Sequence, residues 1–251
     1  MIRETFIAVA LTIQLQGGKP IGTGTGFFYT KDEILYFVTN HHIVLPKQKG
    51  IKPDTLRLKL HVDPNDLTKN QDFDIKLYSK GKPVWHVHKD YNEKKIDIAV
   101  LKLDLHAVQK KYIIKALSGA NFLPKKYVLA PGQDVFVLGY PRGLSDTKHN
   151  LPLARNAMVS SLYPVHFEGN PFFLIDAVLH PGMSGSPVFT KPSNTWVDNQ
   201  GNVDIKAGNP FYFLGVHSDT LHAKLASRKE PLGLGTVWYA NLIDEIIDSI
   251  K

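Results

Sequence analysis

The stretch HPGMSGSP at residues 180–187 places Ser184 between two glycines, behind the apolar run 172–179 and ahead of the apolar pair 188–189. This pattern predicts a serine held on a tight turn between two strands. A turn that aims two successive backbone N–H groups at one point needs dihedral angles that a Cβ atom would obstruct, which explains the glycines. Paired N–H donors of this kind can hold a developing oxyanion.

Two other interpretations of this turn come from its composition. A hairpin turn collects glycine and serine for conformational reasons alone. A nucleophile elbow would need glycine in place of Ser186, and its acid and histidine would follow the serine along the chain. The better partners of Ser184 lie upstream, which disfavours the elbow.

The composition is that of a globular protein. The 251 residues are 43% hydrophobic, enough to bury a sizeable core as one domain or as two halves around a shared cleft. The net charge is +7, and the basic residues are spread along the chain without arginine-rich runs. We therefore expect a solvated surface with mild attraction to acidic partners, and no binding of nucleic acid.

The chain contains no cysteine, which excludes a disulfide framework and a cysteine-based metal site. His86 and His88 share one face of an expected strand, but no acid or further histidine stands at a supporting spacing. We expect neither a metal nor another cofactor. Residues 1–18 favour a strand over a signal peptide, and no segment is long enough to span a membrane, so we expect a cytoplasmic protein without membrane contact.

The first half of the chain has the pattern of short strands separated by polar turns. The glycines of residues 22–26 lack the Lys-Ser/Thr that would complete a phosphate loop, so we expect them to serve close strand packing. Strands are expected at residues 5–15, 24–29, 34–39, 56–62, 73–78 and 83–88.

Two chemically reactive positions end or begin apolar strands in this half. His41 and His42 follow the strand 34–39, and neighbouring side chains of an extended segment point to opposite faces, so one of them is expected to face inward. Asp97 opens an apolar strand, and a buried carboxylate needs a partner such as a histidine N–H. Taken singly, each could equally be a structural histidine or an ordinary strand-entry aspartate.

Together, His42, Asp97 and Ser184 occur in the order and setting that resemble the chymotrypsin-like serine proteases. The segment FVTNHHI at 37–43 is similar to the histidine motif of this family, especially the Thr-Asn-x-His-Val form of the HtrA/Deg branch. Three further segments resemble motifs of the same branch, and the match extends from about residue 5 to residue 250: GTGTGF at 22–27, DIAVL at 97–101 and GMSGSP at 182–187.

The resemblance implies an all-β fold of two six-stranded antiparallel barrels with a C-terminal α-helix at 240–250. The first barrel, residues 1–108, would carry His42 and Asp97. Residues 109–128 would connect it to the second barrel, residues 129–251, which would carry Ser184. We expect no segment of the size of a PDZ domain, so the resemblance does not imply the regulation or the trimer assembly of the HtrA proteases. In the second half, strands are expected at 134–139, 154–163, 172–178, 186–190, 211–217 and 236–239.

The resemblance also assigns catalytic roles. Ser184 would be the nucleophile, His42 its general base and Asp97 the residue that orients His42. The N–H groups of Gly182 and Ser184 would form the oxyanion hole. Met183 stands where trypsin-like zymogens have an aspartate that pairs with a newly cut N-terminus, so we expect no propeptide cleavage.

Specificity is expected from the strand FLGVHSDT at 213–220, which resembles the family strand beside the primary pocket. In the same alignment Val178 forms the base of the pocket, which argues against Lys or Arg before the scissile bond. His217 is similar to the pocket histidine of glutamyl endopeptidases and picornaviral cysteine proteases, which read Glu or Gln, and an imidazole can donate to either. A packed core histidine is the alternative. The expected substrate-binding residues are Val178, His180, His217, Ser218, Asp219 and Thr220.

The sequence thus predicts a serine endopeptidase acting on protein or peptide substrates, with an uncharged residue or Glu/Gln before the scissile bond. Three alternatives remain open. The chain could be a catalytically silent module that holds an extended peptide at the strand edge beside Ser218. It could be gated by a regulatory partner protein, or it could act as an esterase.

Overall fold

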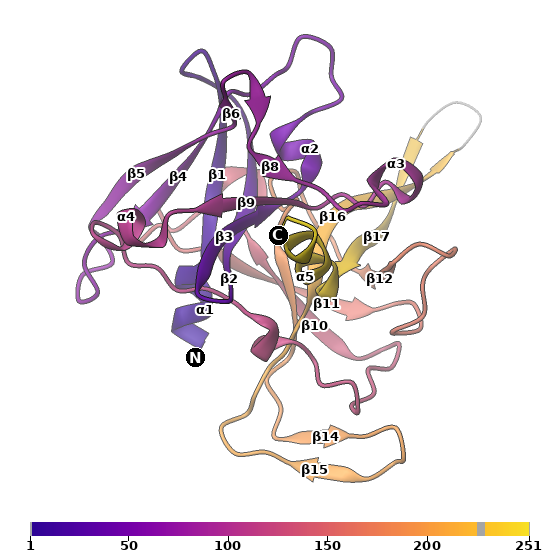
Figure 1. Ribbon diagram of the computed structural model, residues 1–251. Coiled ribbons are helices and arrows are strands. Elements are labelled where there is room, and N and C mark those ends of the chain that lie inside the picture. Colours follow the sequence, from indigo (N-terminus) through magenta and orange to yellow (C-terminus); the bar gives the residue numbers. More distant parts are fainter. Residues whose placement is uncertain (1, 225–228, 251) are drawn as a thin grey trace.

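The computed structural model describes residues 2–224 and 229–250, and its longer strands form two antiparallel β-sheets (Figure 1). The first half of the chain forms a sheet of seven strands. Its order is β5 (Asn70–Lys76), β4 (Thr55–His61), β1 (Val9–Gln16), β2 (Lys19–Lys31), β3 (Ile34–Thr39), β9 (Ala99–Leu103) and β8 (Trp85–His86). The short elements of this half are α1 (Ile2–Ala8), α2 (His41–Val44), β6 (Tyr78–Ser79), β7 (Lys82–Pro83), α3 (Tyr91–Lys94) and α4 (Leu105–Gln109).

The second half closes into a six-stranded barrel. Its order is β10 (Asp134–Gly139), β11 (Leu153–Val159), β12 (Phe172–Asp176), β17 (Lys229–Tyr239), β16 (Phe213–Lys224) and β13 (Pro187–Thr190). A β-ribbon extends from this barrel at one end of the molecule (Figure 1), formed by β14 (Thr195–Val197) and β15 (Val203–Ile205). The remaining elements are the 3₁₀ turns η1 (Gly119–Asn121) and η2 (Pro141–Gly143) and the helix α5 (Asn241–Asp248).

The expected all-β class, the closed second barrel and the C-terminal helix are confirmed. The expectation of a closed six-stranded first barrel is wrong, because the first sheet has seven strands in an open order that ends at β5 and β8. Strand β8 lies within the strand expected at 83–88 and adds to β9 through Trp85↔Leu101 and His86↔Val100. Within the described residues, none of the helices has the length and apolar character needed to cross a membrane.

The expected strand at residues 5–15 is wrong in its first part, because residues up to Ala8 form helix α1 and strand β1 starts at Val9. The register explains the difference. Strand β1 pairs with β2 only as far as Val9↔Phe27. Beyond that point the edge of β2 is occupied by Leu117, which exchanges hydrogen bonds with Phe28 and Thr30. Residues before Val9 therefore have no free strand edge beside β2.

The glycines of β2 do serve close packing, as expected. A Cβ atom at Gly26 would lie 2.3 Å from the Phe37 ring and 2.9 Å from the carbonyl oxygen of Val38. Strands β2 and β3 can approach in this way only without that side chain. Thr25 stands directly before this contact and is fully buried, at the point where the two sheets meet the serine turn.

Helix α5 packs its apolar face into the core as its spacing predicts, with Leu242, Ile243, Ile246 and Ile247 buried. Its polar face is tied to the first half of the chain: Asp244 accepts a hydrogen bond from the Tyr29 hydroxyl at 2.8 Å, and Asp248 lies 2.7 Å from the ammonium of Lys31. The helix therefore joins the two sheets near their interface (Figure 1).

Candidate active site

His42 and Asp97 meet because strands β3 and β9 are neighbours, with Thr39 opposite Ala99. The chain turns from β3 into α2, which carries His42, and Asp97 stands two residues before β9. The Nδ1 atom of His42 lies 2.6 Å from one carboxylate oxygen of Asp97, and the backbone N–H of His42 donates to the other at 2.9 Å. The Asp97 carboxylate therefore holds both the ring and the backbone of His42.

Two further residues fix Asp97. The Ser218 hydroxyl donates to the Oδ2 atom of Asp97 at 2.6 Å, the same atom that faces His42 Nδ1. The Asn40 amide donates to the backbone carbonyl of Asp97 at 2.6 Å. Because a carboxylate only accepts, Nδ1 of His42 must carry a proton, which leaves Nε2 of the neutral ring free to accept one.

The pair has shifted acidities in the directions that ion pairing predicts. Burial lowers the pKa of His42, but the hydrogen bond and charge of Asp97 outweigh burial, so the pKa lies above its ordinary value of 6.5. Burial raises the pKa of Asp97, and the bonds from His42 and Ser218 outweigh this and lower it. Asp97 is thus a carboxylate at neutral pH.

His41 points away from this pair. Its ring is buried and packs against the rings of Tyr91, at 4.6 Å between centroids, and Trp85, at 6.3 Å. Burial lowers the pKa of His41. The two adjacent histidines therefore have opposite environments, one packed among aromatic rings and one bound to a carboxylate.

The serine turn is held by its carbonyl groups. The carbonyl of Pro181 accepts from the N–H of Arg142 at 2.5 Å, and the carbonyl of Met183 accepts from the N–H of Ser186 at 3.0 Å. In a trans peptide the C=O and the following N–H point in opposite directions. These two bonds therefore direct the N–H groups of Gly182 and Ser184 away from the carbonyl anchors.

Neither of these two N–H groups donates a hydrogen bond to the part of the chain that the structure describes. Gly182 has a φ of +95°, and a Cβ atom there would lie 2.5 Å from the carbonyl oxygen of Tyr140. Gly185 has a φ of +86° and is equally enclosed, since its Cβ would lie 2.0 Å from the carbonyl oxygen of Thr25. Both glycines are thus required by conformation and by space, and the turn presents two unpartnered donors beside Ser184.

Thr25 supports this turn from the first sheet. Its N–H donates to the carbonyl of Ser184 at 2.9 Å, and its hydroxyl donates to the carbonyl of Gly182 at 2.8 Å. The same hydroxyl accepts from the N–H of Tyr140 at 3.1 Å. Sequence reasoning missed the roles of Thr25 and Arg142. The only signals were a threonine among the glycines at 22–26 and a residue in the turn at 140–143.

Two cavities flank the site. One, of about 340 Å³, contains Ser184 and five of the six expected substrate-binding residues. It is lined by Leu179, His180, Pro181, Ser184, His217, Ser218, Asp219, Thr220, His222 and Pro231. The other, of about 660 Å³, contains His42 and Asp97, and Ser218 and Asp219 border both. Sequence reasoning missed His222 and Pro231, which enter because β16 continues past His217 and pairs His222 with Pro231 of β17.

Val178 does not form the base of the Ser184 cavity. Its side chain is 66% exposed, and its carbonyl accepts a hydrogen bond from Arg155 at 2.9 Å. The motif spacing places Val178 near the turn, but β12 ends at Asp176, and Leu179 and His180 line the Ser184 cavity where Val178 does not. The apolar base expected at this position is therefore absent from the described structure.

His217 is buried against β17. Its Nδ1 atom lies 3.2 Å from the carbonyl oxygen of Thr236. A carbonyl only accepts, so Nδ1 carries the proton and Nε2 of the neutral ring is an acceptor. Burial lowers the pKa of His217 to about 4, which keeps the ring neutral at pH 7.

The Ser184 hydroxyl makes no hydrogen bond to His42, or to any other residue that the structure describes. Ser218 donates to Asp97 and borders both the cavity that contains Ser184 and the one that contains His42. Catalytic hydrogen bonds often tighten only when substrate is bound. The structure thus shows a formed histidine–aspartate pair and two unpartnered N–H donors beside Ser184, without a hydrogen bond between His42 and Ser184.

A model of the trypsin-like peptidase domain matches residues 24–197, more than half of the chain. The fold is similar to the crystal structure of the serine endoprotease from Yersinia pestis, with a TM-score of 0.57 and 15% identity over 99% of this chain and 64% of that one. It is also similar to the Rv3671c protease from M. tuberculosis in its active form, with a TM-score of 0.53 and 19% identity over 99% of this chain and 83% of that one.

These two likenesses concern the fold, and the chain spans 64% of the length of the Yersinia protein. No curated protein matches the chain. The matched residues 24–197 include His42, Asp97 and Ser184. By the extent of this match, the chain belongs to the family of trypsin-like peptidase domains.

Proposed function

We propose that the chain is a serine endopeptidase that acts on protein or peptide substrates through an acyl-enzyme on Ser184. The observation that carries this proposal is the 2.6 Å contact between His42 Nδ1 and Asp97 Oδ2. It fixes the tautomer in which Nε2 can take a proton, which is what activation of a serine hydroxyl requires.

The remaining steps follow from the geometry of the turn. As Oγ of Ser184 attacks the substrate carbonyl, its proton passes to Nε2 of His42, and Asp97 stabilises the resulting imidazolium. The developing oxyanion accepts hydrogen bonds from the N–H groups of Gly182 and Ser184. His42 then protonates the leaving amine. In the second half of the reaction His42 takes a proton from water as the water attacks the ester, and it returns this proton to Oγ of Ser184 as the carboxylic acid leaves.

Labelling with a fluorophosphonate tests the proposal directly. We expect the full-length chain, without N-terminal trimming, to form one adduct that mass spectrometry maps to Ser184. Buried Met183 occupies the position before the serine and has no charge to pair with a new N-terminus. The adduct should disappear in His42→Ala, and a His41→Ala variant should retain it because the His41 ring packs away from the pair.

A folded sample that forms no adduct would contradict the proposal of a constitutively assembled site. The missing hydrogen bond between Ser184 and His42 favours a second candidate, a protease-fold module whose site is completed only by a partner protein. Under that candidate, labelling appears only after the partner or a tightly bound peptide is added.

The rate should depend on the protonation of His42. A general base must be neutral, so kcat/KM is lost as pH falls through the pKa of His42, and that pKa is raised by Asp97. We expect the acidic limb of a plot of kcat/KM against pH to have a midpoint above 6.5, measured with an amide substrate. A midpoint below 6.5 would show that Asp97 does not control the ionisation of the base.

We further propose that the residue before the scissile bond is uncharged, and that glutamine is preferred over glutamate. The acceptor Nε2 of His217 can pair with the amide NH₂ of glutamine, whereas a glutamate carboxylate offers only lone pairs to it. We expect at least about tenfold higher kcat/KM for a glutamine peptide than for the matched glutamate peptide at pH 7, since a buried unmatched group costs 1–3 kcal/mol. Equal rates, or faster cleavage after glutamate, would discard this role for His217.

A further inference from the structure

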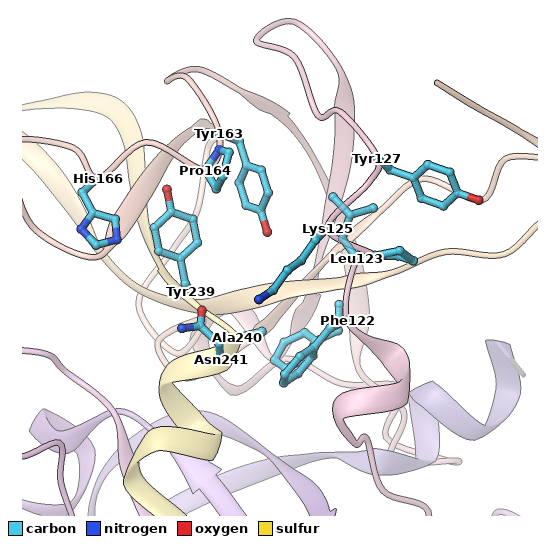
Figure 2. Close-up of a pocket in the computed structure, with 12 residues that line it drawn as sticks. Phe122, Leu123, Lys125, Tyr127, Tyr163, Pro164, His166, Tyr239, Ala240 and Asn241 are labelled. Atoms are coloured by element: carbon cyan, nitrogen blue, oxygen red, sulfur yellow. The ribbon is translucent and has the colours of Figure 1, made fainter. Parts of the chain in front are cut away.

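A third cavity, of about 400 Å³, lies on the second half of the chain and shares none of its lining residues with the two cavities beside Ser184 and His42. Three segments far apart in sequence form it: residues 122–127, the loop 163–166, and the junction of β17 with α5 at 239–241, with Phe213 behind them. Figure 2 shows Phe122, Lys125, Tyr163 and Tyr239 around one space. The volume lies within the range of small-ligand sites.

The walls of this cavity are mainly aromatic. The rings of Tyr163 and Tyr239 meet edge to face at 5.4 Å between centroids, and those of Phe122 and Phe213 lie 5.9 Å apart. The Tyr239 hydroxyl is already used, since it donates to the carbonyl of Val165 at 3.0 Å. Ring faces and edges of this kind favour a flat aromatic group over an aliphatic chain.

Two hydrogen-bond donors face the same space. Figure 2 shows the ammonium nitrogen of Lys125 and the hydroxyl of Tyr163 both ending in the central space of the cavity. Neither forms a hydrogen bond or ion pair with the residues that the structure describes. Burial raises the pKa of Tyr163 to about 12, so its hydroxyl remains a donor at neutral pH. The neighbouring Lys126 differs, because it is paired with Asp204.

The acidic residues of the adjoining helix α5 are engaged elsewhere. Asp244 binds the Tyr29 hydroxyl, and Glu245 lies 3.0 Å from the ring of His88 and accepts from the Asn241 amide at 2.7 Å. The lining itself contains the cation Lys125 and no carboxylate. A ligand that pairs with Lys125 must bring its own negative charge.

We propose that this cavity binds an aromatic carboxylate, with the ring between Phe122, Tyr163 and Tyr239 and the carboxylate on the Lys125 ammonium and the Tyr163 hydroxyl. Such a group occurs on a free aryl acid and at the C-terminus of a polypeptide that ends in an aromatic residue. Both sources present the same chemistry to the cavity.

Titration of the ¹⁵N-labelled full-length chain with N-acetylphenylalanine tests the proposal. We expect saturable shifts of the backbone amides at 122–127 and 239–241, with a dissociation constant of about 1 mM for a ligand of this size. N-acetylphenylalaninamide lacks the charge and N-acetylalanine lacks the ring, so each should bind at least about fivefold more weakly. Shifts confined to residues 217–222 would place the ligand in the Ser184 cavity and overturn the proposal.

Two lysine variants separate the specific contact from general attraction to a basic protein. Lys125→Gln should weaken N-acetylphenylalanine about fivefold, and Lys126→Gln should change its affinity less than twofold. Unchanged melting temperatures would show that both variants remain folded. Equal affinity for the carboxylate and its amide, or equal effects of the two lysine variants, would overturn the role of Lys125.

A peptide ending in phenylalanine with a free carboxylate distinguishes the two sources. If it binds at residues 122–127 at least as tightly as N-acetylphenylalanine, the cavity accepts a polypeptide terminus. If only the small acid binds there, the cavity is a site for a free metabolite-sized acid. Both results support the aromatic carboxylate, and failure of both ligands to bind contradicts it. Since the readout is binding, it does not depend on the peptidase activity of Ser184.

Discussion

The Asp97→Asn variant is expected to lose about 10⁴-fold in kcat while it keeps its fold, by analogy with loss of the orienting acid in serine proteases. Asp97 accepts three hydrogen bonds through its two side-chain oxygens, two from His42 and one from Ser218. An asparagine must replace one of these oxygens with an NH₂ group. Each of its two orientations therefore damages the site in a different way.

If the NH₂ group takes the position of Oδ2, it donates to Nδ1 of His42, and the Ser218 hydroxyl can then only accept from it. The ring then carries its proton on Nε2 and cannot accept one from Ser184. If the amide is reversed, its NH₂ group faces the backbone N–H of His42, which is also a donor. Neither orientation supplies the negative charge that stabilises the imidazolium.

The measurement is kcat and KM for a peptide amide, with the melting temperature as a check on folding. Asp72→Asn is the matched control, because it removes one carboxylate from the surface pair with Arg57 on the outer strands β4 and β5. We expect Asp72→Asn to retain wild-type kcat. Activity of Asp97→Asn within tenfold of wild type would show that the His42–Asp97 pair is not the general-base unit.

The fold could be predicted from the sequence to the extent that hydrophobic patterning determines it. Strands β3, β9 and β10 and helix α5 follow their apolar runs closely. The errors concern edges and ends. Residues 5–8 have the β-rich composition of a strand, but the edge that they would need is occupied by Leu117, which is distant in sequence. Local patterns do not contain information about such competition.

In the candidate site, too, the sequence could place some residues and not others. His42 and Asp97 could be placed together because their motifs resemble those of the chymotrypsin-like serine proteases, and the structure pairs them. The position of Val178 could not, because the direction of a loop after its strand depends on contacts such as the bond from Arg155. The sequence also could not predict which ring nitrogen of His217 carries the proton, because only the contact with the Thr236 carbonyl shows this.

Thr25 is a second residue whose role only the structure reveals. We expect Thr25→Val to lower kcat about 10²-fold, which is similar to the loss caused by removing one oxyanion donor. Valine keeps the shape of threonine and removes the hydroxyl. The carbonyl of Gly182 then loses its donor and the N–H of Tyr140 loses its acceptor, both in a buried environment. The bond from the Thr25 backbone to Ser184 remains in the variant.

The loss concerns orientation, because the Gly182 carbonyl belongs to the peptide that follows the proposed oxyanion donor. With that carbonyl released, rotation about Gly182 can misdirect its N–H group, and glycine resists such rotation least of all residues. KM should change little, since Thr25 is buried and does not line the Ser184 cavity.

Thr25→Ser is the decisive comparison, because it restores the hydroxyl and removes only a methyl group. We expect Thr25→Ser to recover kcat to within about threefold of wild type, and Thr25→Val to remain slow in both hydrolysis and fluorophosphonate labelling, since a hydrogen bond to a buried backbone group stabilises by about 1 kcal/mol and an unmet one costs more. If serine is as slow as valine, packing of the methyl group matters and the hydroxyl does not. If valine is as fast as wild type, the backbone bonds from residue 25, Arg142 and Ser186 orient the turn without the hydroxyl.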